Sequence, residues 1–142
     1  NRISGFQEAC DMIDGLTART LAVQKGDSIL DAAISEIMAQ DNPPTALCFH
    51  QDSQAIPLFF RLQRSGLSVP GDISVTGFDD STFAKEAELT TVRQRPYDMA
   101  VDAAQKALAL IEGQPIEEPF ETFPVQLQVR NSTAKPRTAP LL

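Results

Sequence analysis

The chain is organised around residues 72–80, which read Asp72-Ile73-Ser74-Val75-Thr76-Gly77-Phe78-Asp79-Asp80. Isoleucine, valine and phenylalanine favour extended backbone, and a glycine lets the chain turn where a strand ends. The pattern predicts a short buried strand followed by two carboxylates. Ligands bind at the carboxyl ends of the strands in an open parallel sheet, so Asp79 is a candidate acceptor facing a cleft. The alternative is that Asp79 and Asp80 only cap the next turn.

The composition describes an ordinary globular chain with an acidic balance. Its 142 residues are enough for one domain with a core, and its net charge is -7. An acidic domain repels phosphate backbones, so this chain is not expected to grip nucleic acid. Cys10 and Cys48 fit no disulfide framework or zinc site, are expected to be small buried apolar residues, and are compatible with a reducing compartment. Neither a signal peptide nor an apolar run of membrane-spanning length is visible, so no membrane partner is expected.

Helical and extended patterns alternate along the chain. Helices are predicted at about residues 3–14, 28–40, 52–65 and 96–112, and strands at about 20–23, 45–49, 73–78, 89–94 and 119–130. Residues 81–88 suit a loop or a short helix, and the last dozen residues suit a polar tail. The continuous apolar run at 45–49 predicts a strand buried on both faces. This alternation predicts an α/β fold, a three-layer doubly wound parallel sheet with helices on both faces.

The predicted strand ends are rich in hydrogen-bonding side chains. They lie at residues 24–28, 50–53, 78–80 and 93–95, which a parallel sheet brings to one edge. Such a rim suits a small polar or polyhydroxylated ligand, because every buried hydroxyl needs a partner. No nucleophile elbow, dinucleotide loop or Walker loop is present, so no catalytic residue, cofactor or metal is expected. His50 is the only histidine, and a structural role is the expected one.

The helix at 52–65 is apolar around more than one face. Its apolar residues are Ala55, Ile56, Leu58, Phe59, Phe60 and Leu62. Such a helix is either a core helix covered on two sides or part of a subunit interface. In the second case Leu58, Phe59 and Phe60 are the candidate dimer contacts, and the sequence leaves both possibilities open.

Several motifs in order resemble the lactose-repressor/galactose-repressor (LacI/GalR) family of bacterial transcription regulators. Residues 69–80, Val-Pro-Gly-Asp-Ile-Ser-Val-Thr-Gly-Phe-Asp-Asp, resemble the family signature, and residues 89–94, Leu-Thr-Thr-Val-Arg-Gln, continue the match. Residues 124–133 resemble the closing strand with its Arg-x-Ser-Thr end, and residues 2–6, Arg-Ile-Ser-Gly-Phe, resemble an Arg-x-x-Gly-Phe helix start. The resemblance covers nearly the whole chain.

The resemblance implies a periplasmic-binding-protein-like effector domain with two lobes. Residues 1–134 are expected to be its C-terminal lobe plus the crossover helix at 96–112, and residues 135–142 a tail. The DNA-binding headpiece and most of the first lobe are expected to lie outside this chain. The alanine-rich face of the crossover helix would then lose its packing partner. The implied role is that of a cytoplasmic, non-enzymatic repressor. Its implied partners are a sugar-like effector, a second copy in a homodimer, and DNA through the headpiece alone.

The resemblance also implies a set of effector-binding residues. Arg2 and Asp79 match positions that contact effector, and Gln94 matches a polar position near the pocket and hinge. Gln51 and Asp52 stand where the family usually has Asn-Asp. Ser28 stands where the family commonly has an aromatic residue that stacks on the ligand. The implied effector-binding set is Arg2, Ser28, Gln51, Asp52, Asp79 and Gln94.

Two other functions are compatible with the same sequence. A periplasmic sugar-binding protein of a transport system has the same lobe architecture. A small α/β enzyme would use Asp79 as a general base, which would require a strongly raised pKa in a dry pocket. The sequence supplies no companion nucleophile or cofactor loop for this enzyme.

Overall fold

The computed structural model describes residues 2–21, 32, 34–36 and 38–138. The elements are α1 (Arg2–Asp11), β1 (Ala46–Cys48), α3 (Asp52–Arg64), β2 (Ser74–Thr76), α4 (Thr82–Glu86), β3 (Thr91–Arg93), α5 (Pro96–Ile111) and β4 (Gln126–Gln128). Residues 32, 34–36 and 38 are helical, as expected for the helix at 28–40, whose other residues lie largely outside the described part. Of the strand expected at 20–23, only Thr20 and Leu21 are described, and neither lies in a strand.

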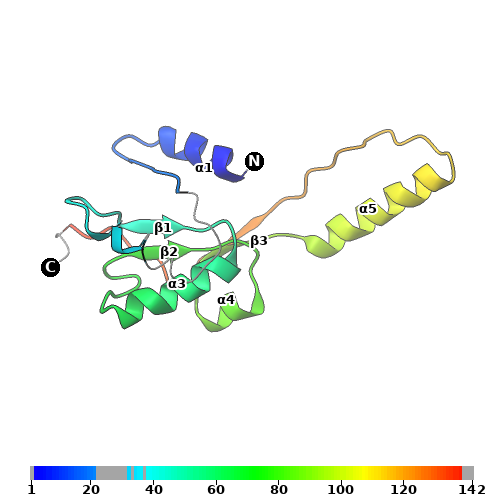
Figure 1. Ribbon diagram of the computed structural model, residues 1–142. Coiled ribbons are helices and arrows are strands. Elements are labelled where there is room, and N and C mark those ends of the chain that lie inside the picture. Colours follow the sequence, from blue (N-terminus) through cyan, green and yellow to red (C-terminus); the bar gives the residue numbers. More distant parts are fainter. Residues whose placement is uncertain (1, 22–31, 33, 37, 139–142) are drawn as a thin grey trace.

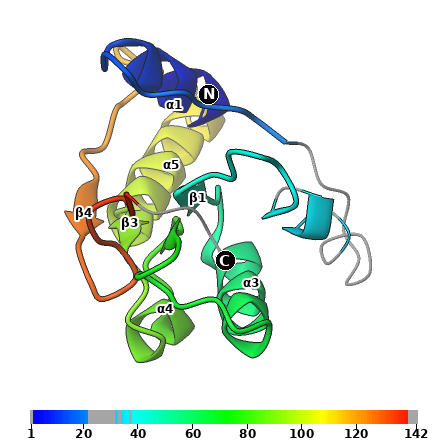
Figure 2. The same cartoon turned by 90° about the vertical axis from the view of Figure 1, so that its left-hand side faces the viewer.

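The described strands form one parallel pair and one antiparallel pair, which a single bridge joins. β1 and β2 pair in parallel with Leu47 opposite Val75, and a parallel bridge joins Thr76 to Thr90 just before β3. β4 pairs with β3 in the antiparallel direction, with Val92 opposite Leu127. Helices α3 and α4 lie on one side of the strands and α1 on the other (Figures 1 and 2). The predicted α/β arrangement is confirmed, with an antiparallel strand added at its edge.

The core lies between α3 and the strands. Ala55, Leu58, Phe59 and Leu62 follow one another at helical spacing and are all buried. They pack with Ile73, Val75, Ala84 and Leu89 in a single apolar cluster. Leu58 and Phe59 therefore belong to the core, and the prediction that they form dimer contacts is wrong. Phe60 points away from the cluster and is 48% exposed, so it alone of the three is available to a partner.

β1 is more exposed than its apolar sequence predicts. Ala46 and Cys48 are exposed and Leu47 is only partly buried. Among the described strands only β2 pairs with β1, so one edge of β1 has no described neighbour. The expectation of burial on both faces is wrong, and so is the expectation that Cys48 is buried. Cys10 is buried, as predicted.

Residues 132–137 are tied to the rest of the fold. Arg137 donates hydrogen bonds to the main-chain carbonyls of Pro43 (2.9 Å), Pro44 (3.2 Å) and Asp72 (2.6 Å). Ser132 is buried and its hydroxyl donates to the carbonyl of Val75 at 2.6 Å. As far as residue 138, the segment expected to be a tail is therefore held against the residues that precede β1 and β2.

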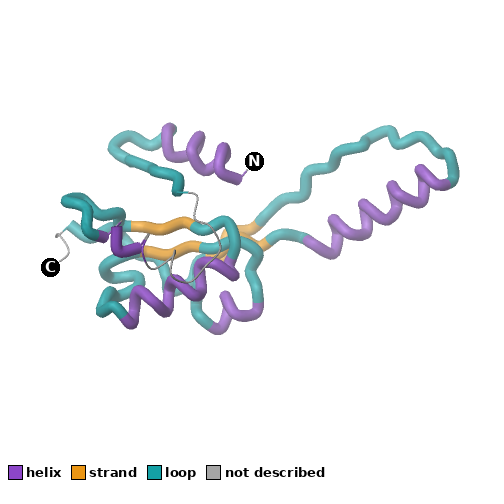
Figure 3. Tube along the Cα trace, viewed as in Figure 1, coloured by secondary structure: helices purple, strands orange, loops and turns teal. Residues whose placement is uncertain are grey.

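Helix α5 projects away from the strands as one side of an arm (Figure 3). The chain returns along residues 112–125 to β4. Lys106 pairs with Asp102 of the same helix at 2.8 Å and joins the two sides through Glu121 at 3.8 Å. No residue of α5 is buried, and its apolar residues Leu110 and Ile111 are largely exposed. Within the described part of the chain, no element covers the apolar residues of this helix. No described helix is long and apolar enough to cross a membrane.

Candidate functional site

The chain turns sharply after β2, at the carboxyl end of the parallel strands. Asp79 has φ 116° and Asp80 has φ 55°, a region that residues other than glycine rarely occupy. The amide of Gly77 donates to the carbonyl of Thr90, and the amide of Asp79 donates to the carbonyl of Val92, both at 2.9 Å. The turn is thus attached to the β3 segment on both sides of Phe78, and residues 77–81 are called the acidic turn below.

Neither aspartate caps the helix that follows. The N-cap of α4 is Ser81, whose hydroxyl oxygen accepts a hydrogen bond from the amide of Ala84 at 3.2 Å. The alternative in which Asp79 and Asp80 serve only as caps is therefore wrong. The two carboxylates instead point into different surroundings, one exposed and one buried.

Asp79 lies in an exposed polar cluster built from three strand ends and α1. Its Oδ1 accepts a hydrogen bond from Nε2 of Gln94 at 2.8 Å and lies 4.0 Å from Nη2 of Arg2. The Arg2 guanidinium stacks 3.9 Å from the centre of the Phe78 ring and donates to the carbonyl of His50 at 2.6 Å. Arg2, Asp79 and Gln94 are therefore brought together at the predicted edge of the sheet.

This cluster combines several hydrogen-bonding types in a small space. The guanidinium of Arg2 supplies donors, the carboxylate of Asp79 supplies acceptors, and the amide of Gln94 supplies both. The Asp79 side chain is 41% exposed and the Arg2 side chain 43% exposed, so a ligand can reach them. Such a set can bind the alternating donors and acceptors of a polyhydroxylated molecule.

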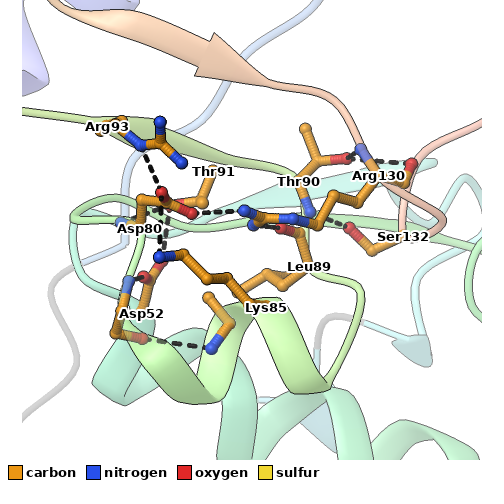
Figure 4. Close-up of polar contacts among 11 residues, drawn as sticks. Asp52, Asp80, Lys85, Leu89, Thr90, Thr91, Arg93, Arg130 and Ser132 are labelled. Atoms are coloured by element: carbon orange, nitrogen blue, oxygen red, sulfur yellow. Dashed lines mark hydrogen bonds and ion pairs between the residues drawn. The ribbon is translucent and has the colours of Figure 1, made fainter.

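Asp80 lies on the buried side of the turn (Figure 4). Its side chain is 2% exposed and contacts Arg93 Nε at 2.5 Å, Arg130 Nη2, and Lys85 Nζ at 3.9 Å. Burial by itself raises the pKa of Asp80, but the hydrogen bonds and charges of Arg130 and Arg93 outweigh it. The pKa of this carboxyl is therefore held below its ordinary value. Asp80 links the turn to β3 and to the segment after β4.

Asp52 also lies inside the protein and not on the exposed cluster. Its side chain, at the first residue of α3, accepts hydrogen bonds from Thr91 Oγ1 at 2.7 Å and from the Ser81 amide at 2.8 Å. The residue is 1% exposed, and each carboxylate oxygen already has a partner. Asp52 therefore does not lie where the resemblance implied, at the exposed surface that an effector could contact.

The two remaining implied effector residues have different outcomes. Gln51 precedes α3, is half-buried, and has its Oε1 3.4 Å from the Ser53 hydroxyl. Ser28 lies outside the described residues. Among the residues that the structure describes, no group of three or more His, Cys, Asp or Glu side chains is placed to hold a metal ion.

Sequence reasoning missed the polar network beneath the turn. The Thr90 amide donates to the Ser132 hydroxyl at 2.8 Å, and Arg130 Nη1 donates to the carbonyl of Leu89 at 2.7 Å. These contacts join segments about forty residues apart, which local patterns do not reveal. The available signal was Thr90 and Thr91, two adjacent hydroxyl residues that are both buried.

Comparison with known proteins agrees with this geometry. The family described as Periplasmic binding protein-like domain matches residues 1–133. The chain belongs to this family. The transcriptional regulator GalR of Escherichia coli (strain K12) is 33% identical over 141 residues, which are 96% of this chain and 41% of GalR. An arabinose metabolism transcriptional repressor of Geobacillus stearothermophilus is 40% identical over 97 residues, or 66% of this chain and 27% of that repressor.

Solved structures show the same relationship. A LacI family transcriptional regulator from Bifidobacterium animalis subsp. lactis superposes with a TM-score of 0.82 at 27% identity, over 96% of this chain and 50% of that chain. A LacI family regulator from Burkholderia phymatum gives a TM-score of 0.72 at 29% identity, over 94% of this chain and 50% of that chain. The resemblance to LacI/GalR regulators is confirmed. The chain spans less than half the length of the curated relatives named above.

Proposed function

We propose that this chain is the C-terminal lobe of the effector-binding domain of a LacI-type repressor. The observation that carries the proposal is the meeting of Arg2, Asp79 and Gln94 at the carboxyl ends of the strands, with Asp79 Oδ1 2.8 Å from Gln94 and 4.0 Å from Arg2. Gln51, at the neighbouring strand end, completes the set offered by the described residues.

The ligand that suits this set is a small polar molecule, a sugar or sugar derivative. Bound between this lobe and the first lobe, it would favour closure of the two lobes and so change the affinity for operator DNA. Coupling of this kind between two sites is typically about 1–3 kcal/mol. This role requires no catalytic group and takes place in the cytoplasm, where the operator lies.

DNA contact is assigned to a headpiece outside this chain. The net charge of -7 supports this assignment, because an acidic lobe repels the phosphate backbone. The N-terminal sequence and intact mass of the parent protein test it. A basic helix-turn-helix segment before the lobes supports the regulator, whereas a processed secretory signal would assign the lobe to a periplasmic sugar-binding protein.

The ligand site is tested by Asp79→Ala in the intact regulator. Operator binding is measured with and without L-arabinose, D-galactose and a panel of other monosaccharides. The variant should lose the response to the sugar that acts on the unaltered protein, because the acceptor for the ligand hydroxyls is gone. Asp41→Ala is the matched control, an exposed aspartate before the amino end of β1. An Asp79→Ala protein with an undiminished response would contradict the site.

The outer face of α3 is proposed as the contact with a second copy. Pro57, Phe60 and Gln63 line an open hollow there together with Arg61 and Arg64. The exposed Phe60 ring is the apolar centre of this face, and such a centre surrounded by polar groups is typical of an interface.

The mass in solution of a Phe60→Asp variant tests this contact. The charge should convert dimers of the intact regulator to monomers, because it would be buried without compensation at the interface. Phe83→Asp is the matched control, since Phe83 is 69% exposed on α4 and lies outside the hollow. Dimers that persist in Phe60→Asp would refute the assignment.

A further inference from the structure

Asp52 lies next to the proposed ligand site without reaching it. We propose that Asp52 is a positioning residue, whose buried carboxylate holds the acidic turn in the conformation that presents Asp79 to Arg2 and Gln94. The inference rests on the proposed function of the Asp79 cluster, and it assigns a role to a side chain that is buried.

Asp52 is bonded to the turn at both of its ends. At one end its backbone amide donates to the carbonyl of Phe78 at 2.8 Å. At the other end its carboxylate accepts from the amide of Ser81 at 2.8 Å. The two residues between these anchors are Asp79 and Asp80, so the segment that carries the ligand acceptor is held on either side by one residue.

The same carboxylate connects the turn to β3. Its Oδ1 accepts from the hydroxyl of Thr91, which is completely buried, at 2.7 Å. The oxygen of that hydroxyl lies 3.4 Å from the amide of Asp80, which donates to it. Asp52 therefore fixes the turn directly through Ser81 and indirectly through Thr91 (Figure 4).

The turn needs to be held because its backbone is unfavourable for the residues in it. Asp79 and Asp80 both have positive φ, which persists in non-glycine residues only where the surroundings impose it. Gly77 shows how closely Asp52 approaches, because a Cβ at Gly77 would collide with Asp52 Oδ1. Released from these contacts, the turn would relax and move the Asp79 carboxylate away from Gln94.

An aspartate suits this position better than an asparagine. Two donors converge on the two oxygens, an N–H from Ser81 and an O–H from Thr91. An amide side chain offers one acceptor and would direct its NH2 group at one of these donors. The location at the start of α3 also favours a negative charge.

Amide hydrogen exchange of the protein carrying Asp52→Asn tests the proposal without a ligand. The Asp79 amide, bonded to Val92, reports on the turn, and the Val75 amide, bonded to Ser132, reports on the core. We expect exchange of the Asp79 amide to accelerate at least tenfold more than exchange of the Val75 amide. Asp72→Asn, the same change at the opposite end of β2, should leave the ratio of the two rates unaltered.

A purely structural Asp52 would give a different result. Both amides would then exchange faster by the same factor, and this outcome, like an unchanged turn, would overturn the proposal. Thr91→Val provides a second variant that removes only the hydroxyl partner and keeps the side-chain shape. It should accelerate exchange at Asp79 selectively, and equal acceleration at both amides would again count against positioning.

Binding of the acting monosaccharide to the intact regulator separates this inference from the proposed function. Asp52→Asn should weaken binding at least tenfold in otherwise unaltered protein, and by less than twofold when Asp79→Ala is already present. If Asp52→Asn weakened monosaccharide binding by the same factor with and without Asp79→Ala, the proposal that Asp52 positions Asp79 would be overturned. If the turn loosens selectively but no monosaccharide binds the unaltered regulator, the sugar function fails while the positioning of Asp79 by Asp52 stands.

Discussion

Replacing Asp80 by asparagine is expected to destabilise the protein by about 3 kcal/mol. The carboxylate is 2% exposed and accepts hydrogen bonds from Arg93 and Arg130. A hydrogen bond to a charged group contributes about 1.5–3 kcal/mol. The Arg93 side chain is 45% exposed and can be rehydrated, so losing its hydrogen bond to Asp80 costs an amount at the low end of this range. The Arg130 side chain is 14% exposed, and leaving it without a counter-ion costs more.

Urea unfolding of the variant and of a matched control measures this difference. Asp98→Asn is the control, because Asp98 pairs with Arg95 at 2.6 Å but the two side chains are 40% and 54% exposed. Exposed pairs contribute less than about 1 kcal/mol, so the control should unfold close to the unaltered protein. A loss below about 1 kcal/mol for Asp80→Asn would refute the reasoning that the buried network stabilises the turn.

The same carboxylate predicts a pH dependence. The pKa of Asp80 is lower in the folded protein than in the unfolded chain. Its contribution to the free energy of unfolding is therefore present above the unfolded pKa of about 3.9 and is lost as pH falls through the folded value. The gap in stability between the unaltered protein and Asp80→Asn should narrow as the solution is acidified. A gap that is constant or widens would contradict the ion-pair account.

Three further changes have expected costs. Gly77→Ala should lower the free energy of unfolding in urea by about 1–3 kcal/mol, because the new Cβ overlaps Asp52. Gly66→Ala is the comparison: its Cβ meets no atom within 4 Å, so this variant isolates the cost of a positive φ. Leu58→Ala, at a fully buried site, should cost about 3–4 kcal/mol, and a loss under 1 would contradict its place in the core. Arg137→Gln should cost about 1–2 kcal/mol and speed proteolysis after residue 130; an unchanged digestion pattern would show that its three carbonyl contacts do not hold the segment.

Local sequence determined the elements and the edge of the sheet at which the site lies. Helix α3 was predicted to within a residue, because its apolar spacing and Gly66 mark its face and its end. The turn after β2 was predicted from Gly77 and the residues beside it. The joint placement of Arg2, Asp79 and Gln94 followed from motifs that resemble one family. The apolar spacing and the glycines lie within a few neighbouring residues, which is the range over which propensity and periodicity act.

Only the tertiary structure decided which acidic groups face solvent. Asp79 and Asp80 are adjacent in the sequence, yet one is 41% exposed and the other 2%. Their difference depends on Arg130, fifty residues further along the chain, and on Asp52, which precedes them by more than twenty-five residues. Burial and hydrogen-bond partners are properties of the packed fold, so no pattern along the chain could assign Asp52 to the interior. The sequence alone determined that carboxylates gather at this edge, and packing determined which of them a ligand can reach.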